Sequence, residues 1–210
     1  RAARRYAAWV ASRPVDIGST TASSLGCLRH PEHREASERE GAAPVMTRVA
    51  SVRCIQSKAN GSLMRATPLA VWGARQSADD TMQAVLRDAR LSHPNDACVG
   101  AAVAYVMAIR HLILAPNDVR GAVAIAEVLA RPFAEPTQWL RDARDGVVVP
   151  FTPQDGFVRI GFTHAFRHLM LGTSYLDALR ETLLGGGDTD TNACIVGGLV
   201  GARVGMNGIP

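Results

Sequence analysis

Apolar residues recur with a helical period along nearly the whole chain. The pattern predicts helices over about residues 2–12, 20–28, 78–90, 96–114, 118–130, 135–145, 157–171, 174–184 and 190–204. Asn95 and Asp96 can cap the longest of these helices, and the segment Pro116-Asn-Asp118 can end it and begin the next. The sequence therefore predicts an all-α fold, an orthogonal bundle of many short helices.

Two segments depart from this pattern. Val147-Val-Val-Pro-Phe151 is the only strand-like run, and Pro150 weakens it because proline cannot donate a hydrogen bond within a sheet. Residues 29–45 are polar, and we predict that they form a mobile surface loop.

Composition limits the class of protein. A chain of 210 residues with 47% apolar and 20% charged residues predicts one globular domain over residues 1–210. The net charge of +4 is dispersed, and no basic stripe is interleaved with aromatic residues, so we expect no nucleic-acid partner. The apolar run after Asn192 is too short and too rich in glycine to span a membrane. We expect a monomer that does not bind membranes.

The cysteines indicate a reducing compartment. Cys27, Cys54, Cys98 and Cys194 lie far apart with no C-x-x-C pair, which argues against a disulfide framework or a zinc site built from cysteines. Cys98 and Cys194 lie in Ala/Val-rich helical runs, where we predict reduced, buried thiols. The sequence opens on helical residues rather than a signal or transit segment, so we expect a cytoplasmic location.

The stretch from Gly185 to Gly205 carries the most chemistry. Three glycines ahead of Asp188 permit a turn that other residues resist. Such a turn directs Asp188, Asp190 and Thr191 into one small volume, where hard oxygen ligands suit Mg²⁺ or Mn²⁺. The alternative is that these residues are plain helix caps, favoured by the helix dipole.

Four motifs in order resemble the ADP-ribosylglycohydrolases, the family of dinitrogenase reductase-activating glycohydrolase and the ADP-ribosyl-acceptor hydrolases. The C-terminal signature is Gly186-Gly-Asp-Thr-Asp-Thr-Asn-Ala193, followed by Gly201-Ala-Arg203 and Ile209-Pro210. The others are Asp16-Ile-Gly-Ser-Thr-Thr21, Asn60-Gly-Ser-Leu-Met-Arg-Ala-Thr-Pro-Leu69 and Leu91-Ser-His-Pro94. The resemblance covers essentially the whole chain, with a charged insertion near 29–45.

The resemblance implies a fold, a reaction and a set of site residues. The fold would be ADP-ribosylglycohydrolase-like, and the reaction a Mg²⁺-dependent cleavage of the bond between ADP-ribose and a protein side chain or small acceptor. Two alternatives remain, a non-catalytic relative that binds ADP-ribose or is structural, as crystallin-like members are, and an unrelated carboxylate-metal hydrolase such as a phosphatase. The implied metal ligands are Asp188, Asp190 and Thr191, and the implied substrate-binding residues are Ser57, Asn60, Gly61, Ser62, His93, Gly186 and Gly187.

The segment Ser57-Lys-Ala-Asn-Gly-Ser62 precedes a predicted helix containing Leu63 and Met64. Its backbone N–H groups can therefore face an anion at a helix N-terminus, although a simple turn and cap is the alternative. Ala59 stands where the family often has glycine. Arg65 either reaches a phosphate or pairs with a carboxylate inside the fold.

Among the histidines, His93 matches a family residue that contacts ADP-ribose, although a turn histidine taken alone is more often structural. His164 and His168 stand four apart on a predicted helix but lack the glutamate of an H-E-x-x-H zinc site. We predict that they lie on a solvated or partly buried helix face.

One acidic pair imitates a family motif. Ser77-Ala-Asp-Asp-Thr81 resembles the family's T-D-D-T metal cluster, but that cluster and the catalytic glutamate precede the D-I-G segment in the family. We therefore interpret Asp79 and Asp80 as caps of the following helix rather than as ligands. The resemblance implies that this chain begins after half of the active site, with the catalytic glutamate upstream and weak metal binding by the three ligands that remain.

Overall fold

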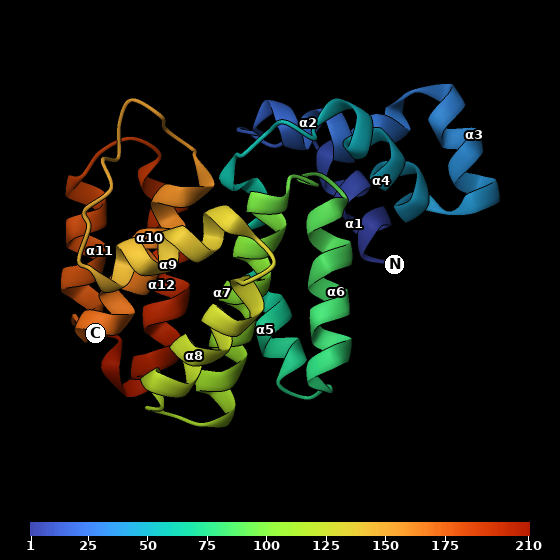
Figure 1. Ribbon diagram of the computed structural model, residues 1–210. Coiled ribbons are helices and arrows are strands. Elements are labelled where there is room, and N and C mark those ends of the chain that lie inside the picture. Colours follow the sequence, from blue (N-terminus) through green and yellow to red (C-terminus); the bar gives the residue numbers. More distant parts are fainter.

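The computed structural model describes residues 1–210, which are 71% helical with 12 α-helices and no strands (Figure 1). The helices are α1 (Ala2–Ala11), α2 (Ser19–Leu25), α3 (Pro31–Glu40), α4 (Ala42–Arg53), α5 (Thr67–Gly73), α6 (Ala78–Arg90), α7 (Asp96–Leu114), α8 (Val119–Ala130), α9 (Ala134–Arg144), α10 (Val158–Leu171), α11 (Tyr175–Leu184) and α12 (Thr189–Val204), with short 3₁₀ turns η1 (Cys27–Arg29), η2 (Asn60–Ser62) and η3 (Met206–Gly208). The all-α prediction is confirmed, and every helix that the apolar period predicted is present.

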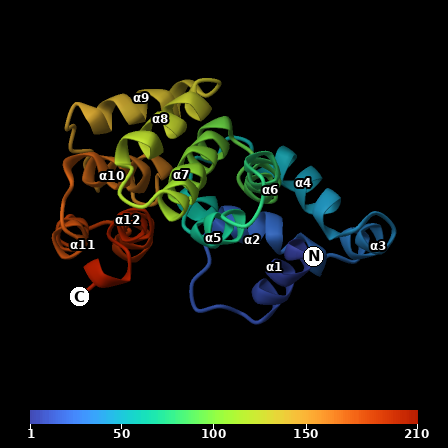
Figure 2. The same ribbon diagram turned by 90° about the horizontal axis from the view of Figure 1, so that it is seen from below.

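Helix α7 is the centre of the fold. It packs against α5, α6, α8, α9, α10 and α12, as the view along the bundle shows (Figure 2). Its small Ala, Val and Gly side chains let neighbouring helices approach from several sides. The helix is long and apolar enough to cross a membrane, but 78% of that apolar window is buried inside the protein. Its hydrophobicity is therefore accounted for by the core.

A buried hydrogen bond ties α7 to its neighbours. The hydroxyl of Tyr105 donates to the carbonyl of Ile195 on α12 at 2.8 Å and lies 3.0 Å from the hydroxyl of Thr67 on α5. Burial raises the pKa of Tyr105, so the phenol stays protonated and able to donate. Three helices that surround the candidate site are thus fixed at one point.

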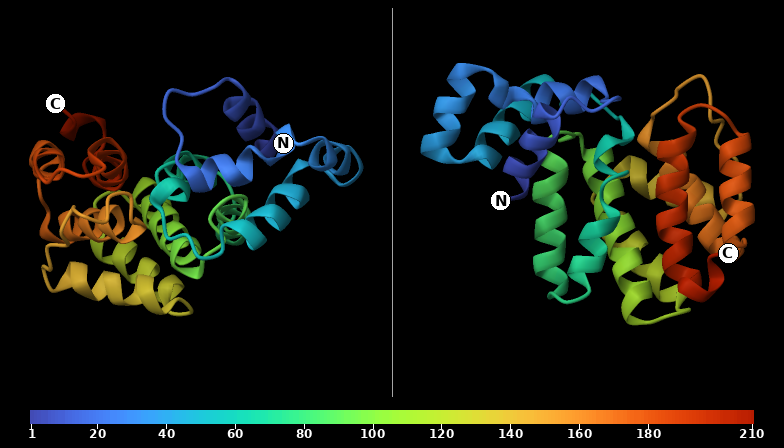
Figure 3. Two further views of the ribbon diagram at one scale, coloured as in Figure 1. Left: turned by 90° about the horizontal axis from the view of Figure 1, so that it is seen from above. Right: turned by 180° about the vertical axis from the view of Figure 1, so that it is seen from behind.

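The buried residues form two main cores. The larger cluster has 35 residues and lies around α7, whereas a second cluster of 10 residues lies among α1 to α4. Helices α1–α4 lie to one side of α7 and α8–α12 to the other (Figure 3). The segments that carry the predicted site residues run between these two parts.

The prediction of a mobile loop over residues 29–45 is wrong. This segment forms η1, α3 and the first turn of α4. The charged side chains of α3 face solvent while Ala36 is buried, and Val45 and Met46 of α4 are fully buried in the second core. Pro31 is tolerated because it begins its helix, where the missing N–H has no partner to lose.

Candidate functional site

The glycine triplet positions the acidic turn. Gly186 and Gly187 have φ of +79° and +67°, in the region that favours glycine. A Cβ on Gly187 would lie 2.5 Å from the carbonyl oxygen of Phe151 and 3.2 Å from Asp155 Oδ1. The turn therefore packs directly against the 151–155 connection, which places Asp188 at the start of α12.

Asp188 does not cap its own helix. It occupies the N-cap position of α12, but its side chain makes no capping hydrogen bond. Instead its Oδ2 accepts a hydrogen bond of 2.7 Å from Nδ2 of Asn60, which is 128 residues away in sequence. The carboxylate is thus held towards the 57–62 segment, and its second oxygen remains available to a ligand.

Asp190 and Thr191 stand in the first turn of the same helix. Asp190 is exposed and Thr191 half-buried, and neither side chain hydrogen-bonds to another residue. Two carboxylates and a hydroxyl are hard oxygen donors, which fit Mg²⁺ or Mn²⁺ in chemical character. No third acidic, histidine or cysteine ligand atom completes a compact group with them, so the donor set falls short of the six oxygens that such ions take.

The 57–62 segment is held by backbone pairing rather than by a helix. The N–H of Asn60 donates to the carbonyl of Gly156 at 2.8 Å, and the N–H of Val158 donates to the carbonyl of Lys58 at 2.9 Å. The predicted helix containing Leu63 and Met64 does not form, because η2 ends at Ser62 and α5 begins only at Thr67. The predicted α-helix at this position is therefore wrong, and a 3₁₀ turn stands in its place; phosphate binding by the segment stays a prediction.

Two serines of this segment differ in their surroundings. Ser57 Oγ lies 2.8 Å from Thr20 Oγ1 of α2, which links the segment to the second core. Ser62 is 1% exposed, and its hydroxyl has no hydrogen-bond partner within the chain. Ser57 is therefore half-buried, whereas Ser62 is enclosed by the fold.

His93 lies in the turn between α6 and α7 and is 1% exposed. A Cβ on Gly61 would lie 2.9 Å from His93 Cε1 and 2.9 Å from Thr21 Oγ1, so glycine is needed for this close approach. Burial, and then the positive charge of Arg65, lower the pKa of His93 to about 3. The imidazole is therefore neutral at physiological pH, and its Nε2 is buried without a partner.

Arg65 is a structural hub inside the fold. Its guanidinium donates to Asp88 Oδ2 at 3.1 Å, to the carbonyl of Gly61 at 2.7 Å and to Ser92 Oγ at 2.8 Å. Tyr6 of α1 donates to the other Asp88 oxygen at 2.9 Å. Of the two alternatives for Arg65, the structure therefore shows the internal ion pair.

This hub favours one tautomer of His93, because the buried Ser92 hydroxyl contacts no acceptor for its own proton other than His93 Nδ1. Ser92 Oγ accepts from Arg65 and lies 2.8 Å from His93 Nδ1, so the hydroxyl proton finds its acceptor in Nδ1. The ring proton then resides on Nε2. His93 consequently presents a neutral N–H donor with no acceptor inside the chain.

The structure brings several predicted site residues together. Asn60 contacts Asp188, and its chain neighbour Gly61 contacts His93, so the acidic turn and the buried histidine are joined through adjacent residues. Sequence reasoning did not assign a role to Thr20 and Thr21, although the D-I-G-S-T-T motif contains them. It also missed the 155–157 segment, which carries no motif.

Three further predictions were tested by side-chain positions. Asp79 and Asp80 lie at the start of α6 as predicted, but in its first turn; the cap itself is Ser77, which accepts from the N–H of Asp80. Cys98 is buried as predicted, but Cys194 is exposed. His164 and His168 are both fully buried, so the prediction of a solvated or partly buried face is wrong.

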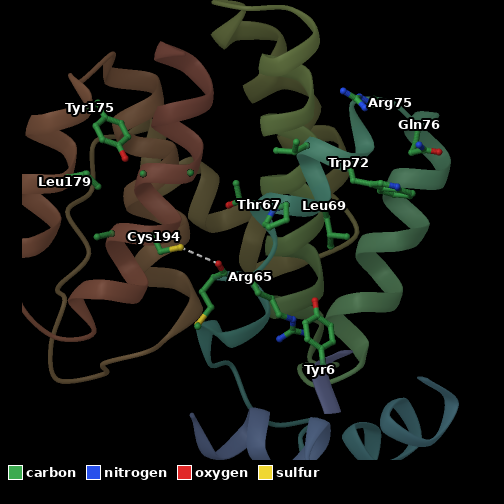
Figure 4. Close-up of a pocket in the computed structure, with 16 residues that line it drawn as sticks. Tyr6, Arg65, Thr67, Leu69, Trp72, Arg75, Gln76, Tyr175, Leu179 and Cys194 are labelled. Atoms are coloured by element: carbon green, nitrogen blue, oxygen red, sulfur yellow. Dashed lines mark hydrogen bonds between the residues drawn. The ribbon is translucent and has the colours of Figure 1, made fainter. Parts of the chain in front are cut away.

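A groove of about 1350 Å³ lies beside the acidic turn rather than over it (Figure 4). Cys194 faces this groove one helical turn after Asp190, and its thiol donates to the carbonyl of Met64. The walls are mainly apolar, so the groove suits packing against protein better than binding a diphosphate. Its lining residues are Tyr6, Met64, Arg65, Thr67, Pro68, Leu69, Val71, Trp72, Arg75, Gln76, Tyr175, Leu179, Ala193, Cys194, Gly197 and Gly198.

Comparison with known proteins gives one consistent family. The ADP-ribosylglycohydrolase family model matches residues 1–210. ADP-ribosyl-(dinitrogen reductase) glycohydrolase of Rhodospirillum rubrum is 27% identical over 98% of this chain and 61% of its own length. A protein of Acanthamoeba polyphaga mimivirus, provisionally named an ADP-ribosyl glycohydrolase, is 29% identical over 96% of this chain and 63% of its own length.

The fold has a counterpart among solved structures. An ADP-ribosylglycohydrolase-related protein complex contains a chain that matches with a TM-score of 0.68 and 22% identity, over 99% of this chain and 64% of that one. At this identity the match shows the fold alone. The present chain spans less than two thirds of the length of each of these relatives.

Proposed function

Because the chain belongs to the ADP-ribosylglycohydrolase family, we propose that it supplies the ADP-ribose-binding surface of a Mg²⁺-dependent hydrolase. The reaction releases ADP-ribose from a protein side chain or a small acceptor by cleaving the glycosidic bond at the ribose. The observation that carries the proposal is the hydrogen bond from Asn60 to Asp188, which directs this carboxylate away from its helix and into the site.

The residues divide the work of binding. Cleavage at the anomeric carbon passes through an oxocarbenium-like state, so a bound water and the ribose hydroxyls must be positioned. A hard dication, when bound by Asp188, Asp190 and Thr191, offers further coordination positions to water and substrate. Asn60 orients Asp188, and the bare backbone at Gly186, where a Cβ would meet nothing within 4 Å, lets the sugar approach closely.

His93 contributes a hydrogen-bond donor. Its neutral Nε2–H is buried and has no acceptor within the chain, and leaving such a group unpaired costs about 1–3 kcal/mol. An oxygen of ADP-ribose beside Gly61 would satisfy this donor. Because the pKa of His93 is about 3, the ring donates without carrying charge at neutral pH.

A second candidate function rests on the incomplete donor set. Asp188 and Asp190 have no third acidic partner in a compact group, which is the arrangement expected of a relative that binds ADP-ribose without cleaving it. The hydrolase proposal requires further oxygen ligands and a catalytic acid besides Asp188, Asp190 and Thr191.

Calorimetric titration of ADP-ribose, with and without Mg²⁺, tests the binding proposal on this chain. We expect binding that Mg²⁺ strengthens, and we expect Asp190→Ala to lose the strengthening. Asp79→Ala is the matched control, because Asp79 is an exposed acid in the first turn of another helix. No ADP-ribose binding in either condition would remove both candidate functions and leave a structural role.

Turnover is tested on the longest natural form of the protein that carries these 210 residues. There, Asp190→Ala should abolish release of ADP-ribose while far-UV circular dichroism shows unchanged helical content. Substrates would be ADP-ribosyl-arginine, ADP-ribosyl-serine and O-acetyl-ADP-ribose in turn, with a phosphate monoester as the negative control. Hydrolysis of the monoester, or unchanged turnover in Asp190→Ala, contradicts the assignment.

A further inference from the structure

Behind the glycine turn, α10 and α11 enclose a second cluster of ligand-type side chains. His164 and His168 lie one turn apart on the same face of α10, and Glu181 of α11 lies against them. One ligand atom from each lies within 4.8 Å of the other two, the only such group of three in the chain. Both histidines are fully buried, whereas the Glu181 side chain is 41% exposed and gives the cluster an opening to solvent.

The hydrogen bonding of His164 leaves one ring nitrogen with an unused lone pair. Its Nε2 lies 2.8 Å from the carbonyl of Val149, which can only accept, so Nε2 carries the proton. Nδ1 is therefore an unprotonated nitrogen, and it is buried without any partner. Histidine ligands to metals commonly show this arrangement, in which the other ring N–H donates to a backbone carbonyl.

His168 mirrors this arrangement. Its Nδ1 lies 3.2 Å from the hydroxyl of Thr173, and its Nε2 is buried without a hydrogen-bond partner, 4.0 Å from Glu181 Oε2. That separation is too long for a hydrogen bond. The cluster therefore contains two buried ring nitrogens and one carboxylate oxygen that converge without satisfying one another.

The two arginines near the cluster are held by hydrogen bonds to other groups. Arg167 donates to Glu181 Oε1 at 2.7 Å, which leaves Oε2 free, and Arg203 is held by the carbonyl of Thr173. Burial is the main reason that the pKa of His164 is lowered and that of His168 is about 4. Glu181 opposes both shifts, whereas Arg167 lowers the pKa of both histidines and Arg203 that of His168. Both imidazoles are neutral at pH 7, so a cation need not displace a proton.

We propose that His164, His168 and Glu181 bind one Zn²⁺ ion, with water in the fourth position. Two imidazoles and a carboxylate form an established zinc donor set, with Zn–N distances of about 2.0–2.1 Å. Tetrahedral geometry then requires ring nitrogens about 3.3 Å apart, so the ligand atoms move together by at most about 1.5 Å. Mg²⁺ prefers an all-oxygen shell, so this site differs in chemistry from the acidic turn.

A zinc ion at this site would also restrain the ring against which the Gly185–Gly187 turn packs. The ring of Phe151 stacks on His164 with centroids 4.2 Å apart, and a Cβ on Gly185 would overlap that same ring. Zinc bound between α10 and α11 therefore fixes the surface on which the Gly185–Gly187 turn rests. The two arginines oppose a dication, so we expect weaker binding than at a four-residue zinc site.

Titration of ZnCl₂ into metal-free protein, followed by calorimetry and by thermal unfolding, tests the proposal. We expect one Zn²⁺ per chain and an unfolding midpoint that rises with free zinc. Glu181→Gln keeps an acceptor for Arg167 but removes the ligand charge, and His168→Gln removes a ring nitrogen. Each should weaken zinc binding by more than the about 10–100-fold that loss of an outer-shell partner costs.

Two controls separate this site from others. His111→Gln removes a histidine that pairs with Asp118 outside the cluster, and Asp79→Ala removes an acid in the first turn of α6; both should bind zinc as the parent does. If His168→Gln fails to fold, Glu181→Gln decides, because its side chain is partly exposed. Parent-like zinc affinity in Glu181→Gln, or no zinc binding by the folded parent protein, overturns the proposal.

Discussion

Replacing Gly187 with alanine tests whether the acidic turn is held by close packing. The substitution has two separable effects, because Gly187 has φ of +67° and its Cβ would lie 2.5 Å from the carbonyl oxygen of Phe151. Gly186 and Gly146 have φ of +79° and +75°, but a Cβ on either meets nothing within 4 Å. These two glycines therefore serve as matched controls that carry the backbone effect alone.

The magnitudes follow from these contacts. A non-glycine residue in the left-handed region costs about 1–2 kcal/mol, and the stiffer unfolded chain returns about 0.4–1 kcal/mol. Gly146→Ala and Gly186→Ala should thus lose about 1 kcal/mol of unfolding free energy. Gly187→Ala adds a clash with fixed backbone, for which overpacking values of about 1–3 kcal/mol apply. Its total is about 3 kcal/mol, or about 6–12 °C in a domain of this size.

Thermal unfolding and ADP-ribose titration on the three variants provide the assay. We expect Gly146→Ala to bind ADP-ribose as the parent does, because it lies far from the turn in sequence and meets no site residue. Gly187→Ala should bind more weakly, because the turn must move to relieve the contact with Phe151. Equal midpoints for Gly187→Ala and Gly186→Ala would refute the packing argument.

Three further predictions concern the surrounding network. Arg65→Lys removes the planar guanidinium that joins Asp88 to the site. We expect urea unfolding to show a free energy of unfolding lower by about 2–3 kcal/mol. Tyr105→Phe leaves the buried carbonyl of Ile195 without its donor, which should cost about 1–2 kcal/mol in the same measurement. The pKa of His93 is about 3 in the folded chain, against about 6.5 for an exposed imidazole. Between these two pH values the unfolded chain therefore binds more protons at His93 than the folded chain does. Its contribution to stability is complete above about pH 6.5 and is lost as the pH falls towards 3. Urea unfolding of His93→Gln between pH 7 and pH 5 should therefore show a shallower pH slope than the parent, by up to about 1.4 kcal/mol per pH unit.

Helices with a clear apolar face could be predicted from the sequence, and those hidden by charge or proline could not. The Glu- and Arg-rich residues of α3 have little apolar period because only Ala36 is buried. In α4, Pro44 lies within the first turn, where proline is tolerated, so Val45 and Met46 could continue a helix. In α5, Pro68 stands near the start in the same way. In these helices proline therefore marks the beginning of the helix.

The site could be predicted only as far as motifs extend. Asn60 and Asp188 both belong to motifs, but no local pattern predicts that residues 128 apart will share a hydrogen bond. Gly156 carries no motif because its role is a backbone carbonyl that accepts from Asn60. His164 and His168 could not be recognised as part of a cluster from the sequence, because the third member, Glu181, lies on the next helix.

The division of the core has a consequence for ligand affinity. Helices α1–α4 are held together by only 10 buried residues, so their amide hydrogens should exchange through local opening while those of α7 exchange only when the whole chain unfolds. Thr21 of α2 lies against Gly61, so a closed N-terminal part is needed for the complete pocket. Binding affinity then depends on the fraction of molecules in which α1–α4 are closed. A cavity made at Met46, within the second core, should weaken ADP-ribose binding by lowering that fraction alone.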